Sequence, residues 1–424
     1  MGSLSMASAK SSFDNSQLFS RLSKNIEGDV LFDAFNRGRY STDASIYQID
    51  PVGVVLPKTE QDLVSAVEIS VDSGVPILAR GGGTSQCGQT VNEAVVIDCS
   101  RHLNKILDFN VEQKTIKVQP GLVLDHLNTF LKPHGLFFPV DISTASRATI
   151  GGMTSNNSCG ARSIHYGIMV DNVRAIDAFL PSGEHFEFAH TPSKLDKLTE
   201  GQGYERIVRQ VREIAHRERI ELEKRFPKLK RRVGGYNLDT INPAGHNMAK
   251  LLVGSEGTLA TFKSIELQLH DIPKHRVMGV CHFPSFYSAM DATQHIVKLD
   301  PVAVELIDST MIDLARDIPI FRPVVESFVK GQPGALLLVE FAGEEFEYLP
   351  AKLKELDRLM SNLGYCDAII EAVEPAFQAR ITEVRQQGLN IMMSMKSAGK
   401  PVSFIEDCAV PLEDLAEYTD RLTE

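Results

Sequence analysis

Hydrophobic residues recur with two different periods in the first part of the chain, which predicts short strands alternating with helices. Short apolar runs predict strands at 52–56, 76–79 and 94–98. The segment 61–73 carries apolar residues at the helical period and is followed by Gly74, which predicts a helix that ends there. A leucine stripe predicts a second helix over 121–134. The alternation indicates an α+β domain with sub-layers over about 50–150 and 151–270.

Two stretches depart from this pattern. Residues 17–40 are predicted to be helical and amphipathic after a polar, serine-rich start, so 1–40 is interpreted as a helical or disordered extension of a domain over 41–272. Residues 204–232 are strongly helical in pattern and densely charged, within an insertion at 191–232. A solvated helix is one interpretation of this stretch, and a contact surface for a partner subunit or domain is the other.

A new pattern begins after Pro273. It predicts strands and helices at 277–283 (strand), 285–298 (helix), 303–307 (strand), 335–341 (strand) and 346–362 (helix). This order is typical of a ferredoxin-like domain, so 273–424 is interpreted as a separate substrate or cap domain.

Composition and charge exclude several classes of protein. The 424 residues are 43% hydrophobic and 23% charged, as in ordinary soluble proteins, and they suffice for two or three domains. A net charge of −11 without a dominant basic stripe argues against a nucleic-acid partner. Apolar stretches such as 335–339 are too short to span a bilayer, and no secretory signal is evident.

Cysteines and histidines show no metal-binding spacing. The six cysteines are scattered without a Cys-x-x-Cys motif, so neither a zinc knuckle nor an iron–sulfur cluster is predicted in this segment. The twelve histidines form no His-x-x-x-His pair, and none follows His295. We therefore predict no metal in this chain and favour a reducing, cytoplasmic location, with a peripheral position at the inner membrane as the alternative.

The most informative motif is Ala-Arg-Gly-Gly-Gly-Thr-Ser-Gln-Cys-Gly-Gln at 79–89. Glycines without a Cβ let backbone N–H groups approach an anion closely, and Arg80 adds a fixed positive charge. The loop is a candidate cradle for a pyrophosphate, although a tight turn between strands is the alternative. It lacks both the Gly-x-Gly-x-x-Gly pattern and a Gly-Lys-Ser/Thr ending.

Three further motifs accompany this loop: the strand-and-helix pattern from Gly53 onward, the glycine- and asparagine-rich segment 139–167, and Gly-Ser-Glu-Gly-Thr-Leu at 254–259. In this order, the four resemble the FAD-binding half of the vanillyl-alcohol oxidase superfamily. The chain is most similar there to the D-lactate, glycolate and D-2-hydroxyglutarate dehydrogenases that are fused to a C-terminal iron–sulfur region. The resemblance implies a two-part FAD-binding domain followed by a partial ferredoxin-like cap.

The resemblance also implies a set of cofactor-binding residues. They are Arg80, Gly81, Gly82, Gly83, Thr84, Ser85, Gly88, Gln89, Pro139, Asp141, Ser143, Thr149, Gly151, Gly152, Asn157, Gly160, Tyr166, Gly167, Glu256 and Gly257. Thr84 stands where some relatives carry a histidine bonded to the flavin, so FAD is expected to be non-covalent, with a tether at Cys87 as the alternative. Turn chemistry would also account for Gly151, Gly152 and Gly160, and a helix-capping role for Glu256.

One arginine is the expected catalytic residue. The stretch 381–411 resembles the same dehydrogenases, whose arginine matching Arg385 binds the substrate carboxylate. A planar guanidinium suits that role, because it meets both carboxylate oxygens. A surface arginine on a helix is the alternative. Glu406 and Asp407 stand where some relatives carry a lysine, which leaves the second substrate contact open.

The resemblance implies oxidation of a D-2-hydroxy acid (D-lactate, glycolate or D-2-hydroxyglutarate) by hydride transfer to the flavin N5. The acceptor is expected to be a protein, a quinone or a fused iron–sulfur domain rather than oxygen or NAD. Relatives continue to a histidine-bearing motif, so we expect a truncated cap and iron–sulfur clusters only in a missing C-terminal region. The alternatives are a flavin-binding module or subunit that is inactive without that region, and an NADPH-dependent sugar-nucleotide reductase.

Overall fold

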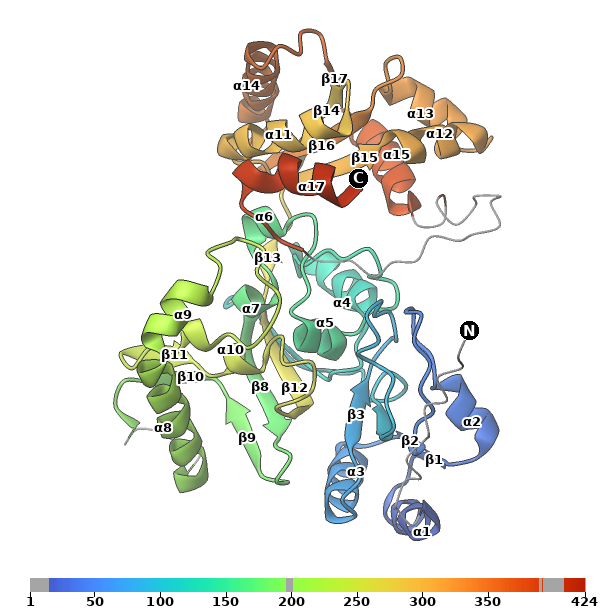
Figure 1. The fold of residues 1–424 in the computed structure, drawn as a ribbon, viewed down its shortest axis with the longest axis vertical. Coiled ribbons are helices and arrows are strands. Elements are labelled where there is room, and N and C mark those ends of the chain that lie inside the picture. Colours follow the sequence, from blue (N-terminus) through green and yellow to red (C-terminus); the bar gives the residue numbers. More distant parts are fainter. Residues whose placement is uncertain (1–14, 196–200, 389–390, 392–407, 424) are drawn as a thin grey trace, which may run out of the picture.

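The molecule has three main sheets (Figure 1). Two of them, described first below, form one half of the molecule, and the third forms a cap above them. The computed structural model describes residues 15–195, 201–388, 391 and 408–423. None of the helices within these ranges is both long and apolar enough to cross a membrane.

The first sheet has the strand order β1-β2-β4-β3. Its strands are β1 (Asp29–Leu31), β2 (Gly53–Leu56), β3 (Ile77–Arg80) and β4 (Val95–Asp98). Strands β2, β4 and β3 are parallel, whereas β1 pairs antiparallel with β2. Helices α1 (Asn15–Asn25) and α3 (Glu60–Asp72) cover this sheet and share a hydrophobic core with it. The remaining helix of this part is α2 (Ala34–Arg39).

The second sheet is antiparallel and has the strand order β5-β6-β12-β8-β9. Its strands are β5 (Ile106–Asn110), β6 (Thr115–Val118), β8 (Val173–Phe179), β9 (His185–Phe188) and β12 (Thr261–Gln268). Two short ribbons flank it, made of β7 (Leu136–Phe137) with β13 (His270–Asp271) and β10 (His190–Pro192) with β11 (Gly245–Asn247). The helices of this part are α4 (Leu124–Leu131), α5 (Ile150–Asn156), α6 (Ser163–Tyr166), α7 (Met169–Asn172), α8 (Gly201–Arg217), α9 (Arg219–Arg225) and α10 (Ala249–Leu252). One large core joins the sheet to several of them.

The cap is built on a four-stranded antiparallel sheet with the order β15-β16-β14-β17. Its elements are β14 (His275–Phe283), α11 (Phe286–Ile296), β15 (Ala303–Asp308), α12 (Ser309–Asp317), α13 (Arg322–Phe328), β16 (Ala335–Gly343), α14 (Leu349–Asn362), β17 (Ile369–Ala372), α15 (Pro375–Gln386) and α17 (Leu415–Thr423). This is the strand order of a ferredoxin-like unit and confirms the predicted class. Separate hydrophobic cores fill the two faces of the sheet.

Several predicted elements need correction. The helix predicted over 17–40 is interrupted by β1, because the chain there pairs with β2. Gly28 permits this close approach, since a Cβ at that position would lie 2.0 Å from the carbonyl oxygen of Leu56. The helix over 121–134 begins only at Leu124, since Val123 makes a bridge to Thr149.

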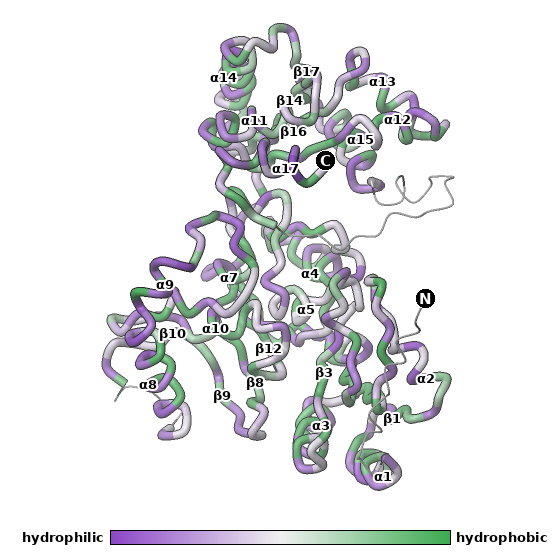
Figure 2. Tube along the Cα trace, viewed as in Figure 1, coloured by the Kyte–Doolittle hydropathy of each residue, from purple (hydrophilic) through white to green (hydrophobic). Residues whose placement is uncertain are grey.

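The charged stretch 204–232 is not one helix. It comprises most of α8 and the shorter α9, which is mostly hydrophilic (Figure 2) and ends before Pro227. Within α8, Tyr204, Val208 and Ala215 are buried, so this helix packs against the protein along one side. The interpretation as a solvated helix therefore holds only for the remaining sides of α8.

Candidate functional site

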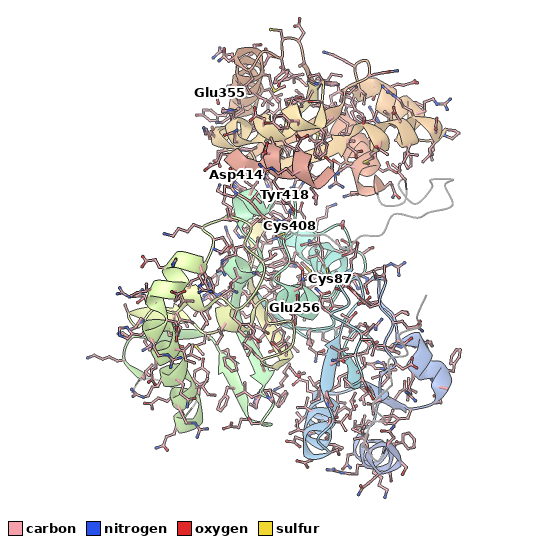
Figure 3. All side chains as sticks on the ribbon, viewed as in Figure 1. Cys87, Glu256, Glu355, Cys408, Asp414 and Tyr418 are labelled. Carbon is pink, nitrogen blue, oxygen red and sulfur yellow. The ribbon has the colours of Figure 1, made fainter. Side chains whose placement is uncertain are left out.

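One cleft brings together three segments that lie far apart in the sequence. It has a volume of about 520 Å³ and is lined by the loop after β3, by the segment 142–159 around α5, and by the loop after α10. Cys87 and Glu256, from the first and last of these, both line it in the lower half of the molecule (Figure 3). The predicted residues that line the cleft are Arg80, Gly81, Gly82, Gly83, Thr84, Ser85, Gln89, Ser143, Thr149, Gly151, Gly152, Glu256 and Gly257.

The glycines of the first loop allow two loops of the protein to meet. A Cβ at Gly81 would lie 2.1 Å from Thr149 Oγ1, and a Cβ at Gly82 would lie 2.4 Å from the carbonyl oxygen of Arg147. We expected these glycines to make room for a ligand, but at both positions the missing Cβ makes room for the protein itself. Within the described residues, the backbone N–H groups of Gly82–Ser85 have no acceptor and remain available to an anion.

Arg80 stabilises the base of this loop. Its Nη1 donates to the carbonyl oxygens of Tyr40 (3.1 Å) and Thr90 (3.0 Å), and its Nη2 donates to that of Thr42 (2.8 Å). Burial lowers the pKa of this guanidinium. The side chain that we expected to supply charge to a phosphate therefore binds the segment 40–42 and Thr90 beneath Gly83.

The segment around α5 presents one asparagine to the cleft and buries the next. Asn156 lines the cleft and donates from Nδ2 to the Glu256 carboxylate at 3.2 Å. Desolvation raises the pKa of Glu256, although hydrogen bonds from Asn156 and Gln89 oppose the shift. The predicted Asn157 is instead buried, ends α5 with φ 57°, and accepts from the backbone N–H of Val170 at 3.0 Å. Sequence reasoning had left Asn156 out of the site.

The other predicted residues lie outside the cleft lining: Gly88, Pro139, Asp141, Asn157, Gly160, Tyr166, Gly167 and Arg385. Gly88 has φ +80° and packs against the ring of Tyr47. A Cβ at Gly160 would lie 2.5 Å from the Asp141 carboxylate, so this glycine makes room for that side chain. Glu406 and Asp407 lie outside the described residues.

A charged cluster joins this half of the molecule to the cap. Arg162 donates from Nε and Nη2 to the two carboxylate oxygens of Glu340 on β16, at 3.2 and 3.1 Å, and from Nη1 to Asp141 at 3.2 Å. Burial raises the pKa of Asp141 to about 6, against the opposing effect of Arg162. Asp141 precedes Ile142 and Ser143 in the cleft wall, so the cluster adjoins the cleft. Glu340 was not predicted, although a charge inside the apolar run 335–341 is a usable signal.

Arg385 lies in α15 on the cap and faces Glu305 of β15. The distance from its Nε to Glu305 Oε2 is 3.1 Å, but the pair is not aligned as a hydrogen bond from that nitrogen. Glu305 is close enough to Asp141 to raise the pKa of that carboxyl further. Glu305, which faces Arg385, lies on the same face of the cap sheet as Glu340, which holds Arg162.

Comparison with known proteins gives two family matches. A family model described as an FAD binding domain matches residues 51–189, and one described as FAD linked oxidases, C-terminal domain, matches residues 272–424. The chain belongs to the FAD-linked oxidases of the vanillyl-alcohol oxidase type. The first match contains the glycine loop and α5, and the second contains the cap. The two sheets below the cap, with their helices, are called the FAD-binding part from here on.

Individual relatives agree with this family. The chain is 32% identical over 420 residues to D-2-hydroxyglutarate dehydrogenase of Haemophilus influenzae, covering 93% of this chain and 40% of the relative. It is 28% identical to glycolate oxidase subunit GlcD of Bacillus subtilis, covering 94% of this chain and 74% of the relative. A solved structure of alkyldihydroxyacetonephosphate synthase shares the fold, with a TM-score of 0.64 at 17% identity over 89% of this chain and 64% of that one. The chain thus spans about two fifths of the H. influenzae relative.

The cleft of this FAD-linked oxidase fits the dinucleotide. Its volume lies in the range of cofactor sites, and its walls combine polar groups with small residues that permit close approach. The N–H groups of Gly82–Ser85 suit a pyrophosphate, because oriented backbone amides bind anions. Within the described part of the chain, no group of three metal-ligating side chains is found.

Proposed function

We propose that this chain binds FAD non-covalently in the cleft and forms the flavin-bearing part of a dehydrogenase for D-2-hydroxy acids. The observation that carries the proposal is that the charged cluster adjoins the cleft: Asp141 pairs with Arg162, and the next two residues, Ile142 and Ser143, line the cleft. A redox cofactor and a carboxylate-binding group would then lie next to each other, as hydride transfer requires. The names of the relatives, which include dehydrogenases of D-2-hydroxyglutarate, support this substrate class.

Each group of residues would have a separate task. The N–H groups of Gly82–Ser85 would hold the pyrophosphate, and Thr149 with the start of α5 would fix the opposite side of the cleft. Bound FAD would supply the oxidant, accepting a hydride from the carbon that carries the hydroxyl group. Arg385 would exchange Glu305 for the substrate carboxylate and so orient that carbon, because an ion pair without hydrogen-bond alignment is replaced readily by a bidentate carboxylate.

The electron acceptor would be a protein, a quinone or a fused iron–sulfur domain. We propose a location in the cytoplasm or peripherally at the inner membrane, because the six cysteines are widely scattered along the chain, as suits a reducing compartment.

The first test is spectroscopic. The purified chain is expected to show oxidised-flavin absorption bands that pass into the supernatant on acid precipitation, whereas colour in the pellet would indicate a tether, with Cys87 the first candidate. Anaerobic addition of D-2-hydroxyglutarate, D-lactate or glycolate should bleach the bands, and L-lactate serves as the control. Flavin that is bound but bleached by none of the D-acids would favour a flavin-binding module that needs a further region or subunit.

A further inference from the structure

Arg276 is a half-buried cation, and the neighbouring carboxylate of Glu340 is already bound by another arginine. It pairs with Ala342 across β14 and β16, and Met278 pairs with Glu340, so Arg276 and Glu340 are diagonal neighbours on one face of the sheet. Glu340 is held instead by both Nε and Nη2 of Arg162. In the described part of the chain, the Arg276 guanidinium has no hydrogen bond and no carboxylate within ion-pair distance.

Tyr166 provides a second group that lacks a partner at the same place. Its ring is held edge-on by Phe137 at 5.4 Å and by His270 at 5.1 Å, between ring centroids. Its hydroxyl makes no hydrogen bond to any of the described residues. Tyr166 ends the short helix that Arg162 caps, and Arg162 binds Glu340, the diagonal neighbour of Arg276, so Tyr166 and Arg276 belong to the same cluster across the boundary between the FAD-binding part and the cap. Burial raises the pKa of the Tyr166 hydroxyl, and the Arg276 charge opposes that shift.

The position of Arg276 relative to Arg385 suits a ligand with two negative ends. Glu305, which contacts Arg385, lies on the same sheet face as Arg276 but on β15, with β16 between them. From the register and standard sheet spacing, the Cα atoms of Arg276 and Glu305 are roughly 16 Å apart. Both Arg276 and Glu305 interact electrostatically with Asp141, in the wall that adjoins the cleft. Arg276 and, through its contact with Glu305, Arg385 therefore lie against one face of the cap sheet at separate places along it.

We propose that Arg276 and Tyr166 form a second anion subsite, which takes the distal carboxylate of a dicarboxylic 2-hydroxy acid while Arg385 holds the carboxylate next to the reacting carbon. This rests on the proposed function and narrows its substrate class, since lactate and glycolate have no second carboxylate. A guanidinium and a phenol hydroxyl supply donors that match one carboxylate group.

The test compares two five-carbon ligands that differ in one carboxylate. Calorimetric titration of the FAD-loaded chain with glutarate and with pentanoate gives an affinity ratio. We expect the wild-type chain to prefer glutarate, Arg276→Gln to lower this ratio about tenfold or more, and Tyr166→Phe to lower it by roughly fivefold. Lys274→Gln is the matched control, because Lys274 is an exposed cation on the same segment, paired with Glu344, and should leave the ratio unchanged.

The proposal is overturned if the wild-type chain shows no preference for glutarate, or if Tyr166→Phe and Arg276→Gln both keep the wild-type ratio. Tyr166→Phe removes one oxygen atom only, so it decides the question if Arg276→Gln fails to fold. Failure of the proposed function looks different. If D-lactate bleaches the flavin but the chain does not prefer glutarate, the proposed function stands and the subsite proposal fails. If the chain prefers glutarate but no D-2-hydroxy acid bleaches its flavin, the subsite is retained and the proposed dehydrogenase function fails.

Discussion

At the scale of single residues, Gly82 decides whether two loops of the FAD-binding part can meet. We predict that Gly82→Ala weakens FAD binding roughly thirtyfold, because a Cβ that lies 2.4 Å from the Arg147 carbonyl oxygen forces one loop to move, at a cost of about 2 kcal/mol. The flavin-to-protein absorbance ratio after dialysis measures the effect, and far-UV circular dichroism should remain that of the wild type.

Gly38 offers the matched control for this substitution. A Cβ at Gly38 meets nothing within 4 Å, and the residue lies inside α2, where alanine is favoured over glycine by up to about 1 kcal/mol. Gly38→Ala should keep its flavin. Full flavin retention by Gly82→Ala would show that FAD binding does not depend on the close contact between these two loops.

At the residue scale, motif spacing was enough to bring several predicted residues to one cleft, whereas backbone geometry decided positions that spacing could not. Spacing identified the glycine loop, Thr149 and Glu256, all of which line one cleft. It could not choose between two consecutive asparagines, because the choice depends on the left-handed turn at the end of α5, which buries Asn157 and directs Asn156 to the cleft. Nor could it show that the Arg80 donors are used by backbone carbonyl groups, two of them about 40 residues earlier in the chain.

At the scale of elements, Asp62 in α3 connects a helix cap to a distant segment. Its carboxylate accepts N–H groups of Glu27, Gly28, Lys58 and Thr59, at 2.8 to 3.3 Å. Burial desolvates this carboxylate and would raise its pKa, but the four donors outweigh that effect and hold the pKa below its ordinary value. The stabilisation is therefore present above about pH 4 and is lost as the pH falls through the lower, native pKa.

We predict that Asp62→Asn lowers the free energy of unfolding by about 2 kcal/mol at pH 7, because an amide cannot accept these N–H groups as a charged carboxylate does. The difference from the wild type should shrink below pH 4, as followed by urea denaturation at several pH values. An exposed acid in the same helix, Glu68, provides the control. Equal differences at pH 3 and pH 7 would contradict the assignment.

Elements with strong periodicity were predicted well. The cap strands β14, β15 and β16 match their predicted apolar runs closely, and α3 differs from its prediction by a single residue at each end. Strands β5 and β6 were not predicted, because only some of their residues are apolar and they owe their structure to pairing with each other and with β12. Pairing over long sequence distances also explains why β1 was mistaken for helix.

At the scale of the whole molecule, Asp141 links stability to pH at the boundary between the two parts. Its native pKa of about 6 lies above the ordinary value of 3.8, so the folded chain binds this proton more tightly than the unfolded chain. Its contribution to stability is full below pH 4 and is lost as the pH rises to about 6 and above.

We predict that the stability of the wild type relative to Asp141→Asn falls by about 2 kcal/mol between pH 4 and pH 7, since the amide cannot ionise. Denaturation midpoints of both proteins across this range measure the change. Parallel curves would show that the Asp141 carboxyl has an ordinary pKa. The result also bears on the cleft, because Asp141 adjoins Ile142 and Ser143 in its wall.

The pair of Arg162 with Glu340 should hold the cap over the FAD-binding part. Only 21% and 10% of these side chains are exposed, so removal of one partner leaves a buried charge. We predict that Glu340→Met costs about 3 kcal/mol in stability, whereas Arg162→Met combined with Glu340→Met costs much less than the sum of the single changes.

A double-mutant cycle measured by urea denaturation tests this, together with limited proteolysis around residue 273, where the chain passes into the cap. The exposed pair Lys274–Glu344 beside the same boundary is the matched control, and its cycle should give less than about 0.5 kcal/mol. Strictly additive costs for Arg162 and Glu340 would mean that the bidentate contact does not couple the two parts. Strong coupling together with faster cleavage in the single variants would show that the position of the cap over the cleft depends on this contact.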